Sequence, residues 1–252
     1  MKTYLIVGNG RCARHFDRYF DLLHIPHFCW NRNDKPERLE SLAEKADRIL
    51  LLVRDSAIIE FFESHPFLTS EKTIHFSGVL SHTKIAGAHP LMTFGPELYD
   101  LETYKQIPFV CENGGRWFSE LLPELPNPHY YIPREKKPLY HALCSMSGNF
   151  TTLLWESVAQ KFATEFKLPS QALAPYLERI FKNLLCEMCA STESNEAKSV
   201  LTGPLERGDS KTIIQHLDAL QGSPEQSLYY AFMNYYFAQN RNRREQNEHL
   251  RF

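Results

Sequence analysis

Residues 4–13 read Tyr-Leu-Ile-Val-Gly-Asn-Gly-Arg-Cys-Ala and decide the fold. A short apolar run passes through Gly8-x-Gly10-x-x-Ala13 directly into a helical pattern, which is typical of the strand, turn and helix start of a dinucleotide-binding unit. Gly8 would allow a tight turn, Gly10 the close approach of a pyrophosphate, and Ala13 the packing of helix on strand. The phosphates would bind backbone amides at the positive end of the helix dipole. The predicted cofactor-binding residues of this turn are Gly8, Asn9, Gly10, Arg11, Cys12 and Ala13.

Strand and helix patterns alternate from this turn to about residue 132. Apolar strands are predicted at residues 3–7, 27–31, 48–53, 73–76, 85–88, 107–111 and 129–132. Helical patterns lie between them, at residues 10–24, 36–46, 55–64 and 113–122. Because fully apolar strands separated by helices need cover on both faces, this half predicts a parallel sheet between helical layers.

The second half of the chain has helical periodicity and no convincing strand. Its helices are predicted at residues 138–166, 170–191, 210–221 and 224–241. The sequence thus predicts an α/β Rossmann-type domain over residues 1–134, followed by an all-α domain over residues 135–252. Pro133 to Pro138, with two prolines around four charged residues, is predicted to be an exposed linker. The polar tail from Arg241 to Phe252 is predicted to be a fraying helix end.

Composition is that of an ordinary soluble globular protein. The chain has 252 residues, of which 43% are hydrophobic and 23% charged, with a net charge of −2. This charge gives no reason to expect a nucleic-acid or anionic-membrane partner. No apolar stretch approaches the roughly 20 residues that span a bilayer. The N-terminus lacks the regions of a signal peptide, so we expect a cytoplasmic protein.

The six cysteines fit a reducing compartment. Cys186 and Cys189 form a C-x-x-C within a helical run and have no second Cys/His pair nearby, so two thiols packed along one helix face are expected and no metal site. The other four lie among apolar or helical residues and are expected to pack as small hydrophobes: Cys12, Cys29, Cys111 and Cys144.

Residues that follow the predicted strands extend the cofactor site. After the second strand, where an NAD-preferring unit usually places an acidic residue, the chain has Asn31 and Arg32. An amide beside a guanidinium suits the 2′-phosphate of NADP, which a carboxylate would repel. The carboxyl ends of two further strands line the same crevice and add Val53, Arg54, Ser77 and Gly78 as predicted cofactor-binding residues.

Three further segments carry candidate catalytic or substrate-binding groups. His89 ends a predicted strand before a proline and could exchange a proton near neutral pH, although a lone histidine is more often structural. His141, Ser145 and Asn149 recur along one helix face, near Ser147, where small residues would equally suit a contact between helices. Arg207, in a loop with two glycines, could bind an anion or pair with a neighbouring acid.

Three pieces of sequence together resemble one family. They are Gly87-Ala-His-Pro-Leu-Met-Thr-Phe94, the Tyr140-His-Ala142 helix with Ser147 and Asn149, and the loop Leu201-Thr-Gly-Pro-Leu-Glu-Arg-Gly-Asp209 with the following Thr212, His216 and Leu217. On these residues the chain resembles Rossmann-like proteins with a C-terminal domain of unknown function 2520. Their architecture is similar to that of β-hydroxyacid dehydrogenases, 6-phosphogluconate dehydrogenase and pyrroline-5-carboxylate reductase.

The resemblance implies an NADP-binding N-terminal domain, and a helical domain like the C-terminal domain of 6-phosphogluconate dehydrogenase that often mediates dimers. The active site would lie in the cleft between them. Asn149 occupies about the place of the helix asparagine of the β-hydroxyacid dehydrogenases, which carry a lysine general acid/base four residues earlier, where this chain has Ser145. This difference argues against β-hydroxyacid oxidation. It leaves a reductase with another proton donor, or a protein that binds nucleotide without turnover.

We therefore expect an NADP-dependent oxidoreductase acting on a small polar carbonyl or imine substrate. The predicted catalytic residues are His89, His141 and Asn149, and the predicted substrate-binding residues are Ser145, Ser147 and Arg207. A non-catalytic NADP-binding regulatory or scaffold protein is the alternative, and a flavin-like or deazaflavin coenzyme in the same crevice is a third possibility. A homodimer is predicted because one helical run has aromatic residues on all sides, which is not expected of a helix exposed to solvent. These residues are Tyr229, Tyr230, Phe232, Tyr235, Tyr236 and Phe237.

Overall fold

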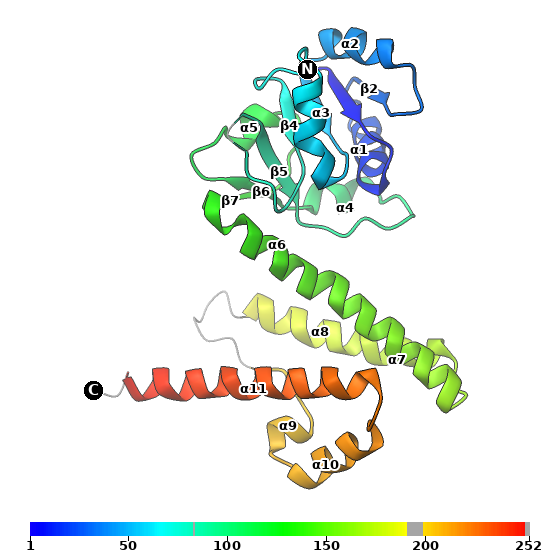
Figure 1. The fold of residues 1–252 in the computed structure, drawn as a ribbon, viewed down its shortest axis with the longest axis vertical. Coiled ribbons are helices and arrows are strands. Elements are labelled where there is room, and N and C mark those ends of the chain that lie inside the picture. Colours follow the sequence, from blue (N-terminus) through cyan, green and yellow to red (C-terminus); the bar gives the residue numbers. More distant parts are fainter. Residues whose placement is uncertain (83, 191–198, 250–252) are drawn as a thin grey trace. The chain divides into compact units, whose positions relative to one another are not determined.

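The computed structural model describes residues 1–82, 84–190 and 199–249. It divides into two compact units, Met1–Val158 and Ala159–Phe252 (Figure 1). The first unit contains the sheet and its helical layers, and the second is helical. The predicted domain boundary at residues 134 and 135 stays a prediction.

A seven-stranded sheet forms the centre of the first unit. Its spatial order is β2-β1-β3-β4-β5-β6-β7. The strands are β1 (Tyr4–Val7), β2 (His27–Trp30), β3 (Arg48–Leu51), β4 (Thr73–His75), β5 (Ala86–Pro90), β6 (Phe109–Glu112) and β7 (His129–Ile132). All seven predicted strands are present, so the prediction of a Rossmann-type sheet is confirmed.

The sheet is not parallel throughout, and here the sequence-based expectation was wrong. β1 to β5 are parallel, but β6 runs antiparallel to β5, and β7 is parallel to β6. Just beyond β5, the Leu91 amide donates to the carbonyl of Pro108, just before β6, at 2.8 Å. A parallel pair would instead need a crossover over one face of the sheet.

Two helical layers bury the alternating side chains of the strands. Tyr4 and Ile6 of β1 face α1 (Arg11–Leu22), α4 (Leu101–Gln106) and α5 (Phe118–Leu121). Leu5 and Val7 face α2 (Pro36–Lys45) and α3 (Ile58–Ser64), which follows a 3₁₀ turn at Asp55–Ala57. This period-two alternation places each face of β1 in a separate apolar core.

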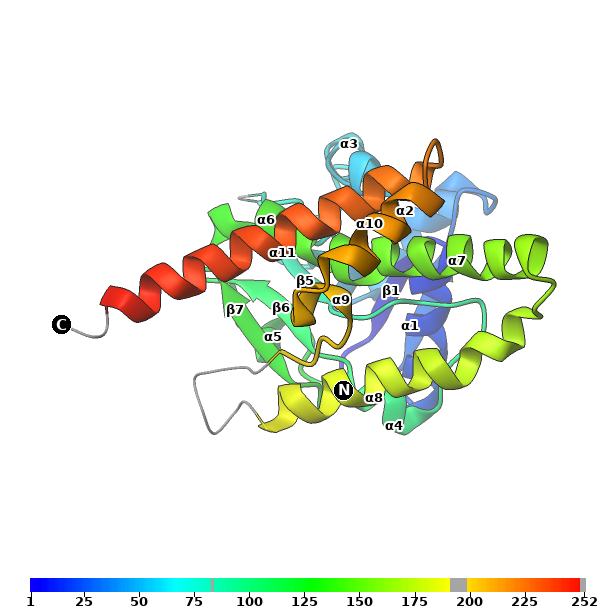
Figure 2. The same ribbon diagram turned by 90° about the horizontal axis from the view of Figure 1, so that it is seen from below.

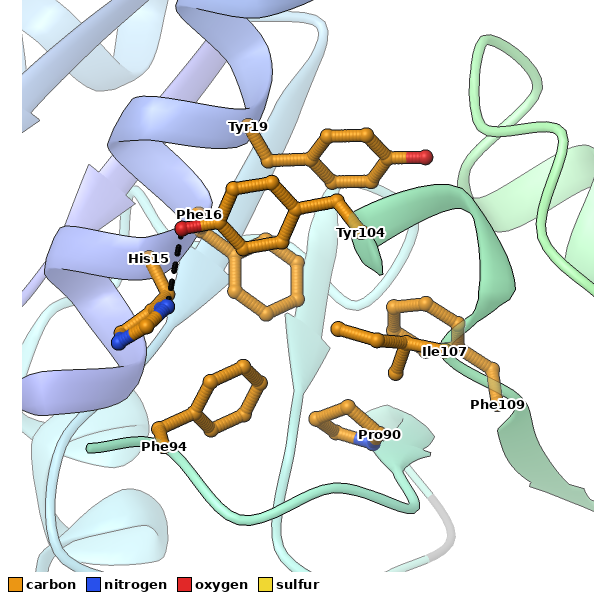
Figure 3. Close-up of a pocket in the computed structure, with 8 residues that line it drawn as sticks. All are labelled: His15, Phe16, Tyr19, Pro90, Phe94, Tyr104, Ile107 and Phe109. Carbon is orange, nitrogen blue, oxygen red and sulfur yellow. Dashed lines mark hydrogen bonds between the residues drawn. The ribbon is translucent and has the colours of Figure 1, made fainter. Parts of the chain in front are cut away.

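A small apolar pocket between α1, β5, α4 and β6 belongs to the core rather than to a ligand site (Figure 3). Its volume of about 10 Å³ is sufficient for about one water molecule. The buried His15 at its edge is fully bonded, because Nδ1 lies 2.9 Å from the Tyr104 hydroxyl and Nε2 lies 3.0 Å from the Gly95 carbonyl. These bonds fasten α1 to the segment that follows β5.

One continuous helical run follows the sheet, as the sequence predicted. It comprises α6 (Lys137–Ser145), a π-helical segment (Met146–Phe150) and α7 (Thr151–Glu165), of which residues up to Val158 belong to the first unit. The predicted exposed linker from Pro133 to Pro138 is wrong at Lys137, which is 2% exposed. Its ammonium is paired with the buried Glu112 of β6, and this pairing draws the start of α6 onto the sheet.

The second unit contains the remaining helices. They are α8 (Ala174–Ala190) after a 3₁₀ turn (Ser170–Leu173), then α9 (Pro204–Arg207), α10 (Ser210–Ala219) and α11 (Pro224–His249). Asp209 caps α10 by accepting from the Thr212 amide at 3.2 Å. α10 packs beside α11, where His216 Nδ1 lies 3.0 Å from the Tyr229 hydroxyl (Figure 2).

Three cysteines differ from the expectation that they pack. Cys186 and Cys189 are exposed on α8, and Cys29 is exposed on β2, where its thiol donates to Asp17 at 3.0 Å. The last three residues of the predicted fraying tail lie outside the described residues. Within the described ranges, no helix combines the length and the apolar character that crossing a membrane requires.

Candidate functional site

The strand order reverses at β1 and β3. β1 has β2 on one side and β3 on the other, so the connections that leave the carboxyl ends of β1 and β3 diverge. Open α/β sheets bind ligands at this switch point. The predicted glycine turn lies directly above it.

The backbone around residue 8 requires a glycine there, whether or not a ligand binds. Its φ is +134°, and a Cβ added there would lie 2.3 Å from the Leu52 carbonyl oxygen, just beyond β3. Its amide also donates to the Trp30 carbonyl beyond β2 at 2.8 Å. The turn therefore brings the ends of β1, β2 and β3 together, and a side chain at position 8 would prevent this close approach.

Gly10 differs from Gly8, because no protein atom lies within 4 Å of a Cβ built on it. Gly10 is the N-cap of α1, and no side chain of the described residues caps this helix. The start of α1 thus combines open space at Gly10 with amides that no side chain of the described residues caps, as an anion site requires. Burial raises the pKa of the Cys12 thiol to about 12, so this thiol is uncharged near neutral pH.

The loop after β2 presents a free guanidinium. Asn31 folds the loop by donating its side-chain amide to Asp34 at 3.0 Å and accepting from the Asn33 amide at 3.1 Å. Asp34 is also paired with Arg38 at 3.5 Å. Within the described part of the chain, the exposed Arg32 has neither an ion pair nor a hydrogen bond, so its charge is available to a ligand.

At the ends of β4 and β5, two of the predicted catalytic residues meet a predicted cofactor residue. The rings of His89 and His141 have centroids 5.7 Å apart. A Cβ on Gly78 would lie 2.5 Å from Cδ2 of His141 and 3.0 Å from Nε2 of His89. Gly78 therefore touches both imidazoles, and only glycine fits there. We call Gly78, His89, Tyr140 and His141 the histidine cluster.

Tyr140 is the member of the histidine cluster that was not predicted as a site residue. Its hydroxyl lies 2.7 Å from His89 Nδ1. Burial, followed by the charges of His141 and Lys137, lowers the pKa of His89 to about 4, so its ring is neutral at pH 7. Burial also raises the pKa of Tyr140. Both partners of this hydrogen bond are therefore uncharged near neutral pH.

A buried charged group lies beside the histidine cluster and was missed by the sequence analysis. The Lys137 ammonium lies 2.9 Å from one oxygen of Glu112, and Arg134 Nε lies 2.8 Å from the other. A Cβ on Gly87 would lie 3.0 Å from Lys137 Nζ and 2.8 Å from Nε2 of the buried His75. The only available sequence signal was a glutamate at the end of an apolar strand.

His75 is kept neutral by this environment. Burial, followed by the charges of Lys137, His82 and His89, lowers its pKa to about 3. The Ser77 amide donates to Nδ1 at 3.3 Å, which leaves Nε2 protonated and without an acceptor among the described residues. The imidazoles of His75 and His89 are therefore neutral, and the charge of the Lys137 ammonium beside them is balanced by Glu112.

The remaining predicted site residues lie outside the histidine cluster. The Ser77 hydroxyl is buried and accepts from the Val79 and Leu80 amides, so it shapes the turn after β4. Val53 and Arg54 follow β3, with Arg54 exposed. Ser145 ends α6, and Arg207 is exposed in the second unit.

Asn149 and Ser147 lie in the π-helical segment, where both are exposed. The Ser147 hydroxyl donates to the Cys144 carbonyl at 3.2 Å. A π-turn changes the angular register of the helix, so the face that Asn149 shares with His141 does not follow from α-helical spacing alone. Such turns are frequent at functional sites.

A family model describes half of this chain. The domain of unknown function DUF2520 matches residues 111–236. The chain belongs to the DUF2520 family. The match begins within β6 and includes α6, the π-helical segment and the helices of the second unit up to Tyr236. No curated protein matches the chain significantly.

Solved structures share the whole architecture at low sequence identity. A candidate NADP oxidoreductase of Bacteroides fragilis is 20% identical, with a TM-score of 0.66 over 93% of this chain and 97% of that chain. A protein of Thermotoga maritima is 21% identical, with a TM-score of 0.64 over 96% and 99%. The imine reductase of Streptomyces aurantiacus is 13% identical, with a TM-score of 0.59 over 94% of each chain. These similarities establish the fold: a Rossmann-type domain followed by a helical domain.

Proposed function

We propose that this protein is an NADP(H)-dependent oxidoreductase that reduces a small polar carbonyl or imine compound. The observation that carries the proposal is the open space at Gly10, at the free amides of α1 and directly above the switch point. The histidine cluster, at the carboxyl ends of neighbouring strands of the same sheet, supplies polar groups where a substrate would react. The imine reductase and the candidate NADP oxidoreductase with the same fold support this class of reaction.

The residues present fit a dinucleotide with a 2′-phosphate. The amides that follow Gly10 would bind the pyrophosphate, and the unpaired Arg32 would bind the 2′-phosphate. Asp34, the nearest acidic residue in the loop, is paired with Arg38 and accepts a hydrogen bond from the Asn31 side-chain amide. When bound, the nicotinamide supplies the hydride, and the protein supplies placement and electrostatics.

His89 would present a hydrogen-bond donor to the substrate rather than a charged acid. With its pKa near 4, the ring carries one proton at neutral pH. If Tyr140 donates to Nδ1, this proton lies on Nε2, on the side of the ring that meets Gly78. A neutral imidazole N–H there would polarise the carbonyl or imine, and His141 would be the second group able to deliver a proton.

Other predicted roles remain part of the proposal. Asn149, Ser145, Ser147 and Arg207 would orient the substrate, and the substrate would bind between the two domains. The protein is proposed to act in the cytoplasm.

Titration of the purified protein with NADPH and with NADH, followed by ligand fluorescence, tests the proposal. Tight binding of NADPH with much weaker binding of NADH is the expected result. Turnover of a panel of small carbonyl and imine compounds with NADPH should then be detectable, and should be abolished by His89→Ala without loss of NADPH binding. Failure to bind either cofactor would refute the proposal, and NADPH binding without turnover of any compound would reduce it to nucleotide binding.

A homodimer is the proposed assembly. Large apolar side chains are exposed at a spacing of three and four residues along α6, the π-helical segment and α7, at Leu139, Leu143, Met146, Phe150 and Leu153. On α11, Tyr230, Phe232, Tyr235 and Phe237 are each at least 46% exposed. Exposed large apolar side chains in such number favour burial against a second chain. Light scattering should give twice the chain mass at micromolar concentration, and a monomeric mass would contradict the dimer.

A further inference from the structure

Four potential metal ligands converge between α1 and β2. His27 and Cys29 lie two residues apart on the strand, and Asp17 and Asp21 lie four residues apart on the helix, so each pair shares one face. His27 Nε2 lies 3.0 Å from Asp17 Oδ1 and 3.9 Å from Asp21 Oδ1. Cys29 Sγ lies 3.0 Å from the same oxygen of Asp17. One atom each of Asp17, His27 and Cys29 lies within 4.8 Å of the other two.

The hydrogen bonding of His27 points to a cation. His27 Nδ1 lies 2.8 Å from the Ile25 carbonyl, which can only accept, so Nδ1 carries the proton. Nε2 then faces the Asp17 carboxylate oxygen at 3.0 Å, and either a proton or a metal ion would lie between the two atoms. Histidine ligands of metals characteristically donate their other N–H to a carbonyl or carboxylate in this way.

With a proton on Nε2, His27 would pair with Asp17 as an ion pair, and the Cys29 thiol would only donate a hydrogen bond to the same carboxylate oxygen. A divalent cation would use Asp17, His27 and Cys29 together and could draw in Asp21, because an imidazole, a thiolate and carboxylate oxygens match the ligands of zinc. In a zinc tetrahedron, neighbouring ligand atoms are about 3.3–3.7 Å apart, given metal–ligand distances of about 2.0–2.3 Å. The observed separations of 3.0 and 3.9 Å need only small side-chain adjustments to reach that range.

We propose that Asp17, Asp21, His27 and Cys29 form a zinc-binding site that clamps α1 to β2. The sequence analysis predicted no metal site, because these ligands come from a helix and a strand and lack a paired Cys/His spacing. His27 pairs in register with Tyr4, at the start of β1, whereas the glycine turn follows the end of that strand. His27 thus lies toward the amino-terminal end of β1, and none of the four proposed ligands is among the predicted cofactor-binding residues.

The test is a zinc titration of the metal-depleted full chain in a Cys186→Ser/Cys189→Ser background, which removes the exposed C-x-x-C pair as a competing ligand. Competition with a chromophoric chelator should show one zinc ion per chain. His27→Gln, Cys29→Ser and Asp17→Asn should each weaken binding at least about tenfold, as expected when a ligand is lost. Cobalt in place of zinc should give a thiolate charge-transfer band that Cys29→Ser abolishes.

Cys29→Ser replaces an exposed side chain, and circular dichroism checks that the variant is folded, so the test does not depend on the less exposed His27. Absence of stoichiometric zinc binding would overturn the proposal and leave an ion pair between His27 and Asp17. Binding that is unchanged by both His27→Gln and Cys29→Ser would also overturn it. NADPH binding, measured on the same samples, reports on the proposed cofactor site separately.

Discussion

The Tyr140 hydroxyl lies 2.7 Å from Nδ1 of His89 and joins the first helix after the sheet to the end of β5. Because Nδ1 is engaged, the other ring nitrogen of His89 is the one that can serve a ligand. The bond therefore fixes the orientation of the imidazole and, if Tyr140 is the donor, places the proton of the neutral ring on Nε2. Its consequence for turnover can be measured directly.

Tyr140→Phe should lower kcat by about tenfold or more, because His89 would lose the partner that fixes its tautomer. NADPH affinity should be unchanged, since Tyr140 is not part of the glycine turn. In a His89→Ala background, Tyr140→Phe should have little further effect, because both residues act through one hydrogen bond. Tyr130→Phe, which alters a 60% exposed tyrosine of β7, is the control. Additive losses in the double variant would contradict the coupling.

The two glycines of the turn should separate stability from cofactor binding. Gly8→Ala should lower the free energy of unfolding by about 2 kcal/mol or more, because its Cβ would clash with the Leu52 carbonyl and its φ is +134°. Gly10→Ala should change stability by about 0.5 kcal/mol or less, since its Cβ meets no protein atom. Gly10→Ala should nevertheless weaken NADPH binding by at least about tenfold, because the methyl group would occupy the space proposed for the pyrophosphate.

Urea unfolding and NADPH titration of the two glycine variants provide the measurements. If Gly10→Ala bound NADPH as tightly as the unaltered protein, the pyrophosphate would not bind at this turn.

The strands and the glycine turn were predictable because each depends on the residue types of one short segment. Seven apolar runs, and a Gly-x-Gly at the end of the first, specify the sheet and its switch point whatever lies elsewhere. The antiparallel β6 was not predictable in this way, because strand direction depends on how the segment after β5 returns. An apolar run has the same composition in either direction.

The histidine cluster was only partly predictable for a similar reason. His89 and His141 had local signals, at a strand end and on a polar helix face, and the structure brings their rings together. Lys137 lay in a segment with the composition of a linker. Its burial depends on Glu112, which is 25 residues earlier in the chain. Pairings over such a separation leave no pattern in a single sequence.

Arg32→Ala should discriminate between the two nicotinamide cofactors. Loss of a charge-assisted contact with the 2′-phosphate should weaken NADPH binding by roughly 1.5–3 kcal/mol and barely alter NADH binding. Arg179→Ala removes an equal charge from an exposed position on α8 and should affect neither. Fluorescence titration of both cofactors against both variants is the measurement. Equal losses for NADPH and NADH in Arg32→Ala would exclude the 2′-phosphate as the partner of Arg32.

Glu112→Gln should be among the most destabilising single substitutions of the first unit. It would leave the Lys137 ammonium, whose side chain is 3% exposed, without its carboxylate, at a cost of about 3–5 kcal/mol. Adding Lys137→Met should recover part of this loss, because the unpaired buried charge is then removed. Glu102→Gln breaks an exposed pair with Lys105 and should cost less than about 1 kcal/mol. Urea unfolding compares them, and similar costs for Glu112→Gln and Glu102→Gln would contradict the buried pairing.

The neutral state of His75 should make stability depend on pH. Its pKa falls from an ordinary value of 6.5 in the unfolded chain to about 3 in the folded protein. Between these values the unfolded chain binds more protons than the folded protein. The stabilisation is therefore complete above about pH 6.5 and is lost as the pH falls toward 3. One such histidine contributes a slope of about 1.4 kcal/mol per pH unit, and His89, whose pKa is about 4, adds a second in the same direction.

His75→Gln and His75→Phe test this slope without relying on absolute stability. The two side chains differ in polarity and shape, so their stabilities at pH 7 should differ. Both variants lack the titrating group. Between pH 6.5 and pH 4.5, the free energy of unfolding of each variant should therefore depend less on pH than that of the unaltered protein. The slope should be smaller by the same amount in both variants, by up to about 1.4 kcal/mol per pH unit. Urea unfolding at several pH values gives the slopes. A slope that is unchanged in both variants would show that His75 is protonated equally in the folded and unfolded states, which its complete burial beside Lys137 opposes.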